Sequence, residues 1–420
     1  MPVLLIESRE IILLLEKRYK KRVHNHKIVK KMGGRTLIER EEIWEILKEY
    51  DKGKIAIGCI GSHSALDIAD GAKDEGFETY VWSEKGREEP YTRFFKSKYH
   101  DSTLVKGCVD HPIVLQSFKE TLQYEKYIRE KNILWIPNRS FVCYCGIDAT
   151  ENDFYVPYVG SRNLLRMEER EEEKSYYWVC EKADLPIPKK IDDPDEIDRL
   201  VMVKLHHAQM KLERGFFTTG SPEEYRKKSD ELIRQGVITQ QDLKKARIEE
   251  YAIGPVMNFN FFYSPVSKEL GEEPIELMGI DWRFESSLDG LVRIPAAQQL
   301  TLPEHQKNPI MTVVGHNDCT IRESLLRNVF PLAEKFVKAT KEHFSPGMVG
   351  AFTIQTIIKS DMKPVIYDIA TRVGGGTNVH MWNGAPYGNV LWRERMSTGR
   401  RTIFEIKRAI DEDLLNLIIT

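Results

Sequence analysis

Short apolar runs alternate with amphipathic stretches in the first part of the chain. KIAIGCI (54–60), ETYVWS (78–83) and ILWIP (133–137) have the length and composition of buried strands. The stretches 62–76 and 115–132 have the apolar spacing that is typical of helices. Strands that alternate with helices predict an α/β fold with a parallel sheet that helices cover on both faces.

Polar residues follow two of these strands at their carboxyl ends, where parallel sheets bind ligands. Ser62 and His63 come after the first run, and Ser140 comes after the third. His63 stands at a predicted helix start, whose N–H groups can bind an anion. A lone histidine is more often a structural hydrogen-bonding residue, so both interpretations stay open here. FVCYCG (141–146) is predicted as a further strand.

The middle of the chain changes from charge-rich to strand-rich. The run from Glu168 to Lys174 favours a solvated helix. MVKL (202–205) and GFFTT (215–219) are predicted as partner strands joined by the loop HHAQMKLERG. The elements predicted beyond them are helices at 222–236, 239–251 and 322–344, and strands at 258–265, 275–285, 290–296, 351–359 and 364–373.

The last two predicted strands are joined by a short polar turn, which indicates a hairpin. A hairpin places Gln355 opposite Asp368 or nearly so, with their oxygens converging on one cation. Magnesium accepts such a sparse set, because phosphates and waters complete its octahedron. A cross-strand polar pair on a solvated face is the alternative.

The end of the second strand of this hairpin presents a carboxylate, a guanidinium and glycines together. Alternation puts Asp368, Ala370 and Arg372 on one face. Gly374 to Gly376 follow and let backbone N–H groups approach a ligand, which suits a metal-bound polyphosphate. Taken alone, this stretch fits an acid–base pair on a surface strand slightly better.

Two further segments carry residues that suit a nucleotide. Lys204 ends its predicted strand and can reach α- and β-phosphates, although a solvated edge lysine is the commoner case. Glu249, Glu250 and Tyr251 form a segment that could offer backbone groups to an adenine edge and a carboxylate to a ribose. Neither segment is specific by itself.

Composition excludes several classes of function. The 420 residues contain 62 basic and 64 acidic side chains, a net charge of −2, so any anion site must be local. We therefore expect no nucleic-acid or membrane partner, and the sequence contains no apolar run of about 18 residues. Six scattered cysteines form neither a zinc pattern nor a disulfide framework, which predicts a reduced cytoplasmic protein.

Long segments, in order, resemble one family, the archaeal formate-dependent ligases of 5-aminoimidazole-4-carboxamide ribonucleotide (AICAR). These PurP-type synthetases belong to the ATP-grasp superfamily. The resemblance covers roughly residues 40–420. It rests on IGSHSALDIADGAKDEGF, KGREEPYTRF, RSFVCYCGID, VPYVGSRNLLRME, IEEYAIG, FYSP, FESSLDGLVRIPA, IRESLL, GMVGAF and ATRVGGGTN.

The resemblance implies a Rossmann-like preATP-grasp domain followed by an ATP-grasp (α+β) domain of two subdomains. It places a helical extension at 1–40, the Rossmann-like substrate domain at 41–160, the small ATP-grasp subdomain at 161–255 and the catalytic subdomain at 256–420. Family members use ATP to activate formate as formyl phosphate, which the 5-amino group of AICAR attacks in purine synthesis. The implied cofactors are ATP and Mg²⁺ or Mn²⁺, and a homo-oligomer is expected.

Individual positions carry over from the family's motifs. His63 and Ser140 match positions that contact AICAR, and Glu285 matches an ATP contact. Gln355 and Asp368 match the magnesium ligands. The segment from about 188 to 250 matches the part around the nucleotide, where the resemblance assigns ATP binding to Lys204, Glu249, Glu250 and Tyr251. As the γ-phosphoryl group moves, Lys204 and Arg372 would offset its charge.

The sequence departs from the family at the site. The loop HHAQMKLERG has no glycine before its last residue, which makes close approach of its N–H groups to phosphate harder. Asp368 replaces a glutamate, Ala370 replaces a small polar residue, and His316 replaces an asparagine that contacts AICAR, with Asn317 adjacent. These changes leave open a paralogue that uses another amine or carboxylate, or a nucleotide-binding protein with weakened catalysis.

Overall fold

The computed structural model describes residues 37–170, 172–205, 216–307 and 312–420. From Ile38 onward the chain forms one compact unit. Nearly all of the predicted extension and the whole loop HHAQMKLERG lie outside the described residues, so the expectations for them stay predictions, as do the domain boundaries. Among the described residues, no helix is long and apolar enough to cross a membrane.

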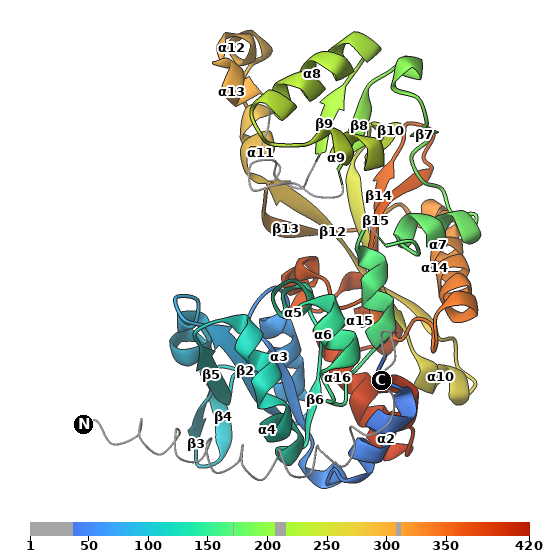
Figure 1. The fold of residues 1–420 in the computed structure, drawn as a ribbon. Helices are drawn as coiled ribbons and strands as arrows, with labels where there is room; N and C mark the ends of the chain where they lie inside the picture. Colours follow the sequence, from blue (N-terminus) through green and yellow to red (C-terminus); the bar gives the residue numbers. More distant parts are fainter. Residues whose placement is uncertain (1–36, 171, 206–215, 308–311) are drawn as a thin grey trace, which may run out of the picture. The chain divides into compact units, whose positions relative to one another are not determined.

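The first sheet is parallel, as predicted (Figure 1). Its strands run in the order β5 (His111–Leu115), β2 (Glu78–Glu84), β1 (Ala56–Ile60) and β6 (Ile133–Trp135). Every residue of β1 is buried, which accounts for its apolar composition. Helix α3 (Ala65–Asp74) follows β1 and packs against α16 (Thr398–Asp411), a helix from the far end of the chain.

The second and third sheets are antiparallel. The second has the order β7 (Lys190–Ile191), β10 (Arg247–Glu250), β8 (Val201–Lys204) and β9 (Phe216–Thr219). The third has the order β13 (Val313–Cys319), β12 (Ile275–Glu285), β11 (Val256–Tyr263), β14 (Gly350–Ile358) and β15 (Pro364–Ala370). The predicted hairpin is β14–β15, and Gln355 lies opposite Asp368 in it.

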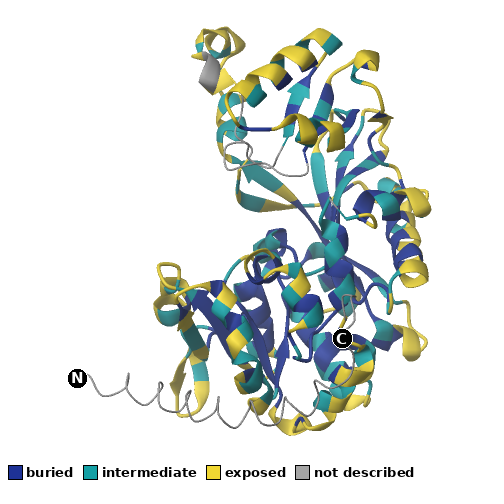
Figure 2. Ribbon diagram, viewed as in Figure 1, coloured by how far each residue is buried: buried dark blue, intermediate teal, exposed yellow. Residues whose placement is uncertain are grey.

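Helices cover these sheets and connect them. Figure 2 shows α8 (Pro222–Arg234) largely exposed on the second sheet, whereas α14 (Glu323–His343) buries Phe336 against Phe352 of the third. The remaining elements are α2 (Arg40–Lys48), β3 (Lys98–His100), β4 (Thr103–Lys106), α4 (Glu125–Glu130), α6 (Ile147–Asn152), α7 (Tyr176–Lys182), α9 (Gln240–Lys245), α10 (Pro265–Glu269), α11 (Ser286–Leu291), α12 (Ala296–Thr301), α13 (Glu304–Lys307), α15 (Pro386–Trp392) and α17 (Leu415–Ile418).

Two predictions in the first part of the chain were wrong. The segment FVCYCG is not a strand, because it belongs to helix α5 (Arg139–Cys145). The Asn138 side chain accepts a hydrogen bond from the Phe141 N–H and caps this helix, an effect that outweighs the β preference of the residues behind it. The helix predicted over 115–132 is a 3₁₀ segment, Phe118–Tyr124, followed by the short α4.

Three predictions in the middle of the chain were also wrong. The acidic run from Glu168 is not a helix, because Glu168 ends a 3₁₀ segment and its carboxylate pairs with distant arginines. The helix predicted over 239–251 stops at Lys245, after which the chain enters β10 and pairs with β8. The segment 290–296 forms no strand, since it lies at the end of α11 and the start of α12.

A buried ion-pair network joins α16 to the third sheet. Arg401 is fully buried, and its Nε and Nη2 donate to the two carboxylate oxygens of Glu276 on β12, each at 2.8 Å. Its Nη1 donates to Glu405 at 2.9 Å, and the Ser264 hydroxyl donates to the same carboxylate at 2.8 Å. Because α16 also packs on α3, this network ties the antiparallel sheet to the layer that covers the parallel one.

Arg401→Met would remove the cation and leave Glu276 and Glu405 buried without it. We expect the free energy of unfolding to fall by about 3–5 kcal/mol, the usual cost of breaking a buried ion pair. The control Lys52→Met removes the same charge from an exposed pair with Asp413 and should unfold near the wild-type denaturant midpoint. Equal midpoints for the two variants would contradict a stabilising network.

Candidate active site

Two cavities meet at the hairpin β14–β15. The first has a volume of about 580 Å³ and is lined by the loop after β1, by β11–β13 and by the glycines after β15. The second, of about 970 Å³, is lined mainly by β8, β10 and the outer ends of β12 and β15. Both cavities are lined by Arg283, Gln355, Ala370 and Arg372.

The predicted residues at the parallel sheet come together beside the first cavity. The Ser140 hydroxyl donates to Ser62 Oγ at 2.8 Å and lies 3.3 Å from His63 Nδ1. The Asn138 amide donates to the carbonyls of Ile60 and Ser62, which fixes the loop after β1. His63 therefore lines the cavity while Ser140 supports it from behind.

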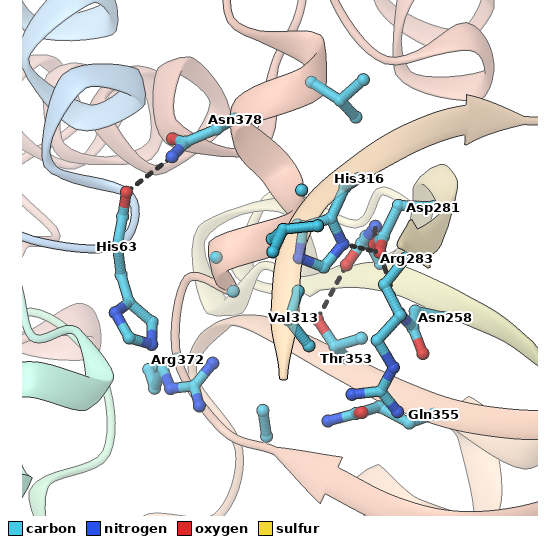
Figure 3. A pocket seen from close by; sticks show the side chains of 18 residues that line it. His63, Asn258, Asp281, Arg283, Val313, His316, Thr353, Gln355, Arg372 and Asn378 are labelled. Carbon is cyan, nitrogen blue, oxygen red and sulfur yellow. Dashed lines mark hydrogen bonds and ion pairs between the residues drawn. The ribbon is translucent and has the colours of Figure 1, made fainter. Parts of the chain in front are cut away.

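His63 is held in an electropositive position. The residue is exposed, yet desolvation of the ring, Arg372 and Arg139 together lower the pKa of His63 to about 4. The Asn378 amide donates to the His63 carbonyl at 2.6 Å, as Figure 3 shows. At neutral pH His63 is therefore an uncharged imidazole that can donate and accept hydrogen bonds.

A buried carboxylate organises the opposite wall of the first cavity. Asp281 accepts hydrogen bonds from the amides of Asn258 at 2.8 Å and Asn260 at 2.7 Å. His316 Nδ1 lies 2.7 Å from Asp281 Oδ2 and donates to it, which fixes the orientation of the ring (Figure 3). Burial would raise the pKa of Asp281, but the bonds from His316, Asn258 and Asn260 lower it overall. Asn317, the neighbouring alternative, is exposed on the other face of β13.

The glycines after β15 line the first cavity and not the second, and their expected contact with a polyphosphate stays a prediction. A Cβ on Gly376 would lie 2.5 Å from Asp281 Oδ2, and one on Gly375 would lie 3.3 Å from the His63 ring. Glycine is thus required by the close approach of the chain to these two side chains.

The second cavity contains a buried lysine. Lys204 Nζ lies 2.5 Å from Glu249 Oε1 and donates to the Tyr177 hydroxyl at 2.7 Å. Burial lowers the pKa of Lys204 although Glu249 raises it. The lysine is therefore not a solvated edge residue. The Glu249 carboxylate also accepts from Tyr177 and Arg247, so it is committed to these cations and this hydroxyl rather than directed at a ribose.

The other predicted nucleotide contacts surround this lysine. Glu250, Tyr251 and Glu285 line the second cavity, and Glu250 also pairs with Lys359 at 3.3 Å. Tyr251 follows β10 directly, where its N–H bonds to the Leu200 carbonyl.

The predicted metal ligands share one hydrogen bond. The Gln355 amide donates to Asp368 Oδ2 at 3.3 Å, and its Oε1 accepts from the Tyr367 hydroxyl at 3.2 Å. The described residues contain no group of three or more His, Cys, Asp or Glu that could hold a metal ion. The Gln355 nitrogen, not its oxygen, faces Asp368, so the expected convergence of the two side-chain oxygens on one cation stays a prediction.

The sequence analysis did not identify Arg283. It lines both cavities, and its Nη2 donates to the Tyr367 hydroxyl. Alternation along β12 was a usable signal, because Asp281, Arg283 and Glu285 are spaced two apart and all three line cavities. Arg372, which was predicted, lies 3.2 Å from Glu168 through its Nη2.

The chain is similar to known proteins along most of its length. A family model described as a protein of unknown function (DUF1246) matches residues 57–191, and a domain of unknown function (DUF1297) matches residues 224–420. A protein of Methanobrevibacter smithii is 40% identical over 386 residues, which cover 91% of this chain and 99% of the relative. A protein of Methanocaldococcus jannaschii is 39% identical over 387 residues, which cover 91% of this chain and 100% of the relative. Both are named 5-formaminoimidazole-4-carboxamide-1-(beta)-D-ribofuranosyl 5'-monophosphate synthetase.

Solved structures give a consistent result. The IMP biosynthesis protein PurP from Thermococcus kodakaraensis is 26% identical, with a TM-score of 0.64, and covers 87% of this chain and 100% of its own. An N5-carboxyaminoimidazole ribonucleotide synthetase in complex with ADP is 11% identical, with a TM-score of 0.53. The match covers 82% of this chain and 78% of that synthetase. The predicted fold class, a Rossmann-like domain followed by an ATP-grasp domain, is confirmed.

We expect the His63 ring to titrate near pH 4. Arg372→Gln should raise this midpoint toward the usual histidine value of about 6.5, because it removes a nearby positive charge. NMR titration of the histidine ring protons, assigned with His63→Gln, measures it. Arg226→Gln, which removes an exposed arginine of α8, is the control and should leave the midpoint unchanged. A midpoint near 6.5 in the unaltered protein would contradict the electropositive environment.

Proposed function

Because the chain belongs to the family of 5-formaminoimidazole-4-carboxamide-1-(beta)-D-ribofuranosyl 5'-monophosphate synthetases, we propose that it uses ATP to formylate the 5-amino group of AICAR with formate. It is a C–N bond-forming ligase of purine biosynthesis. The observation that carries this function is the identity of about 40% along 91% of the chain, with full coverage of the relatives. Two cavities that meet at one hairpin support a reaction between a nucleotide and a second large substrate.

The reaction has two steps. A formate oxygen attacks the γ-phosphorus of ATP, the bond from that phosphorus to the β–γ bridging oxygen breaks, and ADP leaves. The amine nitrogen of AICAR then attacks the carbon of formyl phosphate, inorganic phosphate leaves with the C–O electron pair, and the nitrogen loses a proton. The products are formylated AICAR, ADP and phosphate.

The second cavity holds the nucleotide in this proposal, and the first holds AICAR. Lys204 and Arg372 bind phosphate oxygens and offset their charge, which is the main contribution that a protein makes to phosphoryl transfer. Asp368 and Gln355 would hold a magnesium or manganese ion, which neutralises the triphosphate when bound. His63, supported by Ser140, and His316, fixed by Asp281, orient AICAR through hydrogen bonds.

A ligase for a different amine is the second candidate. It is favoured by His316, which by the family resemblance replaces an asparagine that contacts AICAR. The planar amide of asparagine matches a carboxamide with adjacent donor and acceptor atoms, whereas the imidazole of His316 uses its donor on Asp281. A site with unmatched polar groups discriminates strongly between substrates.

ADP release measured with ATP, magnesium, formate and AICAR, each omitted in turn, tests the proposal. We expect release to require all four. Release that continues without AICAR but responds to another amine favours the second candidate. No release under any combination, from protein that still binds ATP, overturns the ligase assignment.

Asp368→Asn should weaken magnesium-dependent ATP binding by about tenfold or more, because it removes the negative charge closest to the metal. The control Asp361→Asn removes a carboxylate from the exposed turn of the same hairpin. Calorimetric titration of ATP with and without magnesium compares the two. A folded Asp368→Asn protein with the magnesium dependence of Asp361→Asn would refute the metal role.

A further inference from the structure

The junction of the two cavities is the place where a group can pass from one substrate to the other. Among the described residues, only Arg283, Gln355, Ala370 and Arg372 line both cavities. The transferred formyl group must contact the γ-phosphate in the second cavity and the amine in the first. Its position is therefore restricted to the space between these four side chains, which we call the junction.

Two of the four side chains at the junction are cations. Gln355 is neutral and the Ala370 side chain is a methyl group, whereas Arg283 forms an ion pair with Glu285 and Arg372 forms one with Glu168. Both side chains are largely buried, with 15% exposure for Arg283 and 11% for Arg372. A small anion is the ligand that such a position favours.

Each guanidinium retains donors for such an anion. Arg283 Nη2 donates to the Tyr367 hydroxyl, and its Nε lies 3.4 Å from Glu285 Oε1 without a hydrogen bond. Arg372 Nη2 donates to Glu168, whereas its buried Nε has no hydrogen-bond partner among the described residues. A guanidinium carries five N–H donors in a planar fork, and each of these two uses one with a described residue. In Figure 3 the side chain of Arg283 extends toward Gln355, while Arg372 lies on the side of His63.

We propose that Arg283 binds the carboxylate of formate at the junction, and that Arg283 and Arg372 together hold the formyl phosphate made from it, an inference that rests on the proposed function. Arg283 is the acid-binding residue that the reaction requires in addition to the nucleotide contacts. Its fork binds the carboxylate by two N–H bonds, which leaves one oxygen lone pair free to attack the γ-phosphorus. After ADP leaves, the same donors face the new phosphate oxygens until the amine displaces them.

Tyr367 positions Arg283 relative to the predicted metal ligand. Its hydroxyl accepts from Arg283 and lies 3.2 Å from Gln355 Oε1, to which it donates. The Tyr367 hydroxyl thus holds both Arg283 and Gln355 in place. In this proposal it fixes the position of formate relative to the γ-phosphate.

Steady-state kinetics of two Arg283 variants test the proposal. Arg283→Gln should raise the KM for formate by about 100-fold, because it removes a charged, doubly hydrogen-bonded partner. The KM for ATP should change by less than about threefold. Arg283→Lys keeps the charge and loses the fork, so its KM for formate should fall between those of the wild type and Arg283→Gln. The control Arg170→Gln removes an arginine that lines only the second cavity and should affect ATP instead.

Isotope exchange isolates the first step. Without AICAR, wild-type enzyme with formate should scramble the bridging β–γ oxygen label of ATP through reversible formyl phosphate formation, and Arg283→Gln should not. Arg283→Lys replaces Arg283→Gln in this comparison if the latter does not fold. An unchanged formate KM, or equal rises in the KM values of formate and ATP, overturns the proposal. Wild-type enzyme that releases no ADP with formate and AICAR overturns the proposed function itself.

Discussion

The site depends on the pairing of β14 with a strand on each side. In this register Asn258 of β11, Gln355 of β14 and Asp368 of β15 lie in one row across the sheet. Side chains in such a row project from the same face, and a slip of one residue would turn Gln355 to the other face. A register shift directly after Gln355 ends the regular pairing there. The positions of Gln355 and Asp368 are therefore consequences of backbone hydrogen bonds, whereas Arg372 of the junction lies in the loop after β15.

Local patterns were sufficient for elements whose environment is uniform along their length. The parallel strand Ala56–Ile60 is buried throughout, so its apolar composition predicted it. The strands of the hairpin β14–β15 have side chains that alternate between two faces, so the short polar turn and this period predicted them. The strand predicted for FVCYCG was wrong because a short apolar run fits a helix or a strand equally. Here the Phe141 N–H donates to the Asn138 side chain, and this cap favours the helix. The helix predicted from Glu168 onward was wrong because the carboxylate of Glu168 pairs with Arg372, which is 204 positions away in sequence.

Residue chemistry at the site was more predictable than residue grouping. Lys204, Gln355, Asp368, His63 and His316 were identified from strand ends and from the family resemblance, and each of them lines a cavity. The division of these residues between two cavities could not be predicted, because it depends on how three separate sheets pack. For the same reason, the place of the glycines after β15 in the first cavity could not be predicted, and Arg283 was not identified although it lies between Asp281 and Glu285 on β12.

The ion pair of Lys204 with Glu249 affects which anions the protein admits. A lysine buried to this degree is stable only with a counter-ion, and Glu249 already supplies one at 2.5 Å. Any phosphate that reaches Lys204 must therefore compete with a carboxylate held in place by Tyr177 and Arg247. The proposed nucleotide can therefore reach Lys204 only by sharing or displacing this carboxylate, and the pair sets an electrostatic cost for its binding.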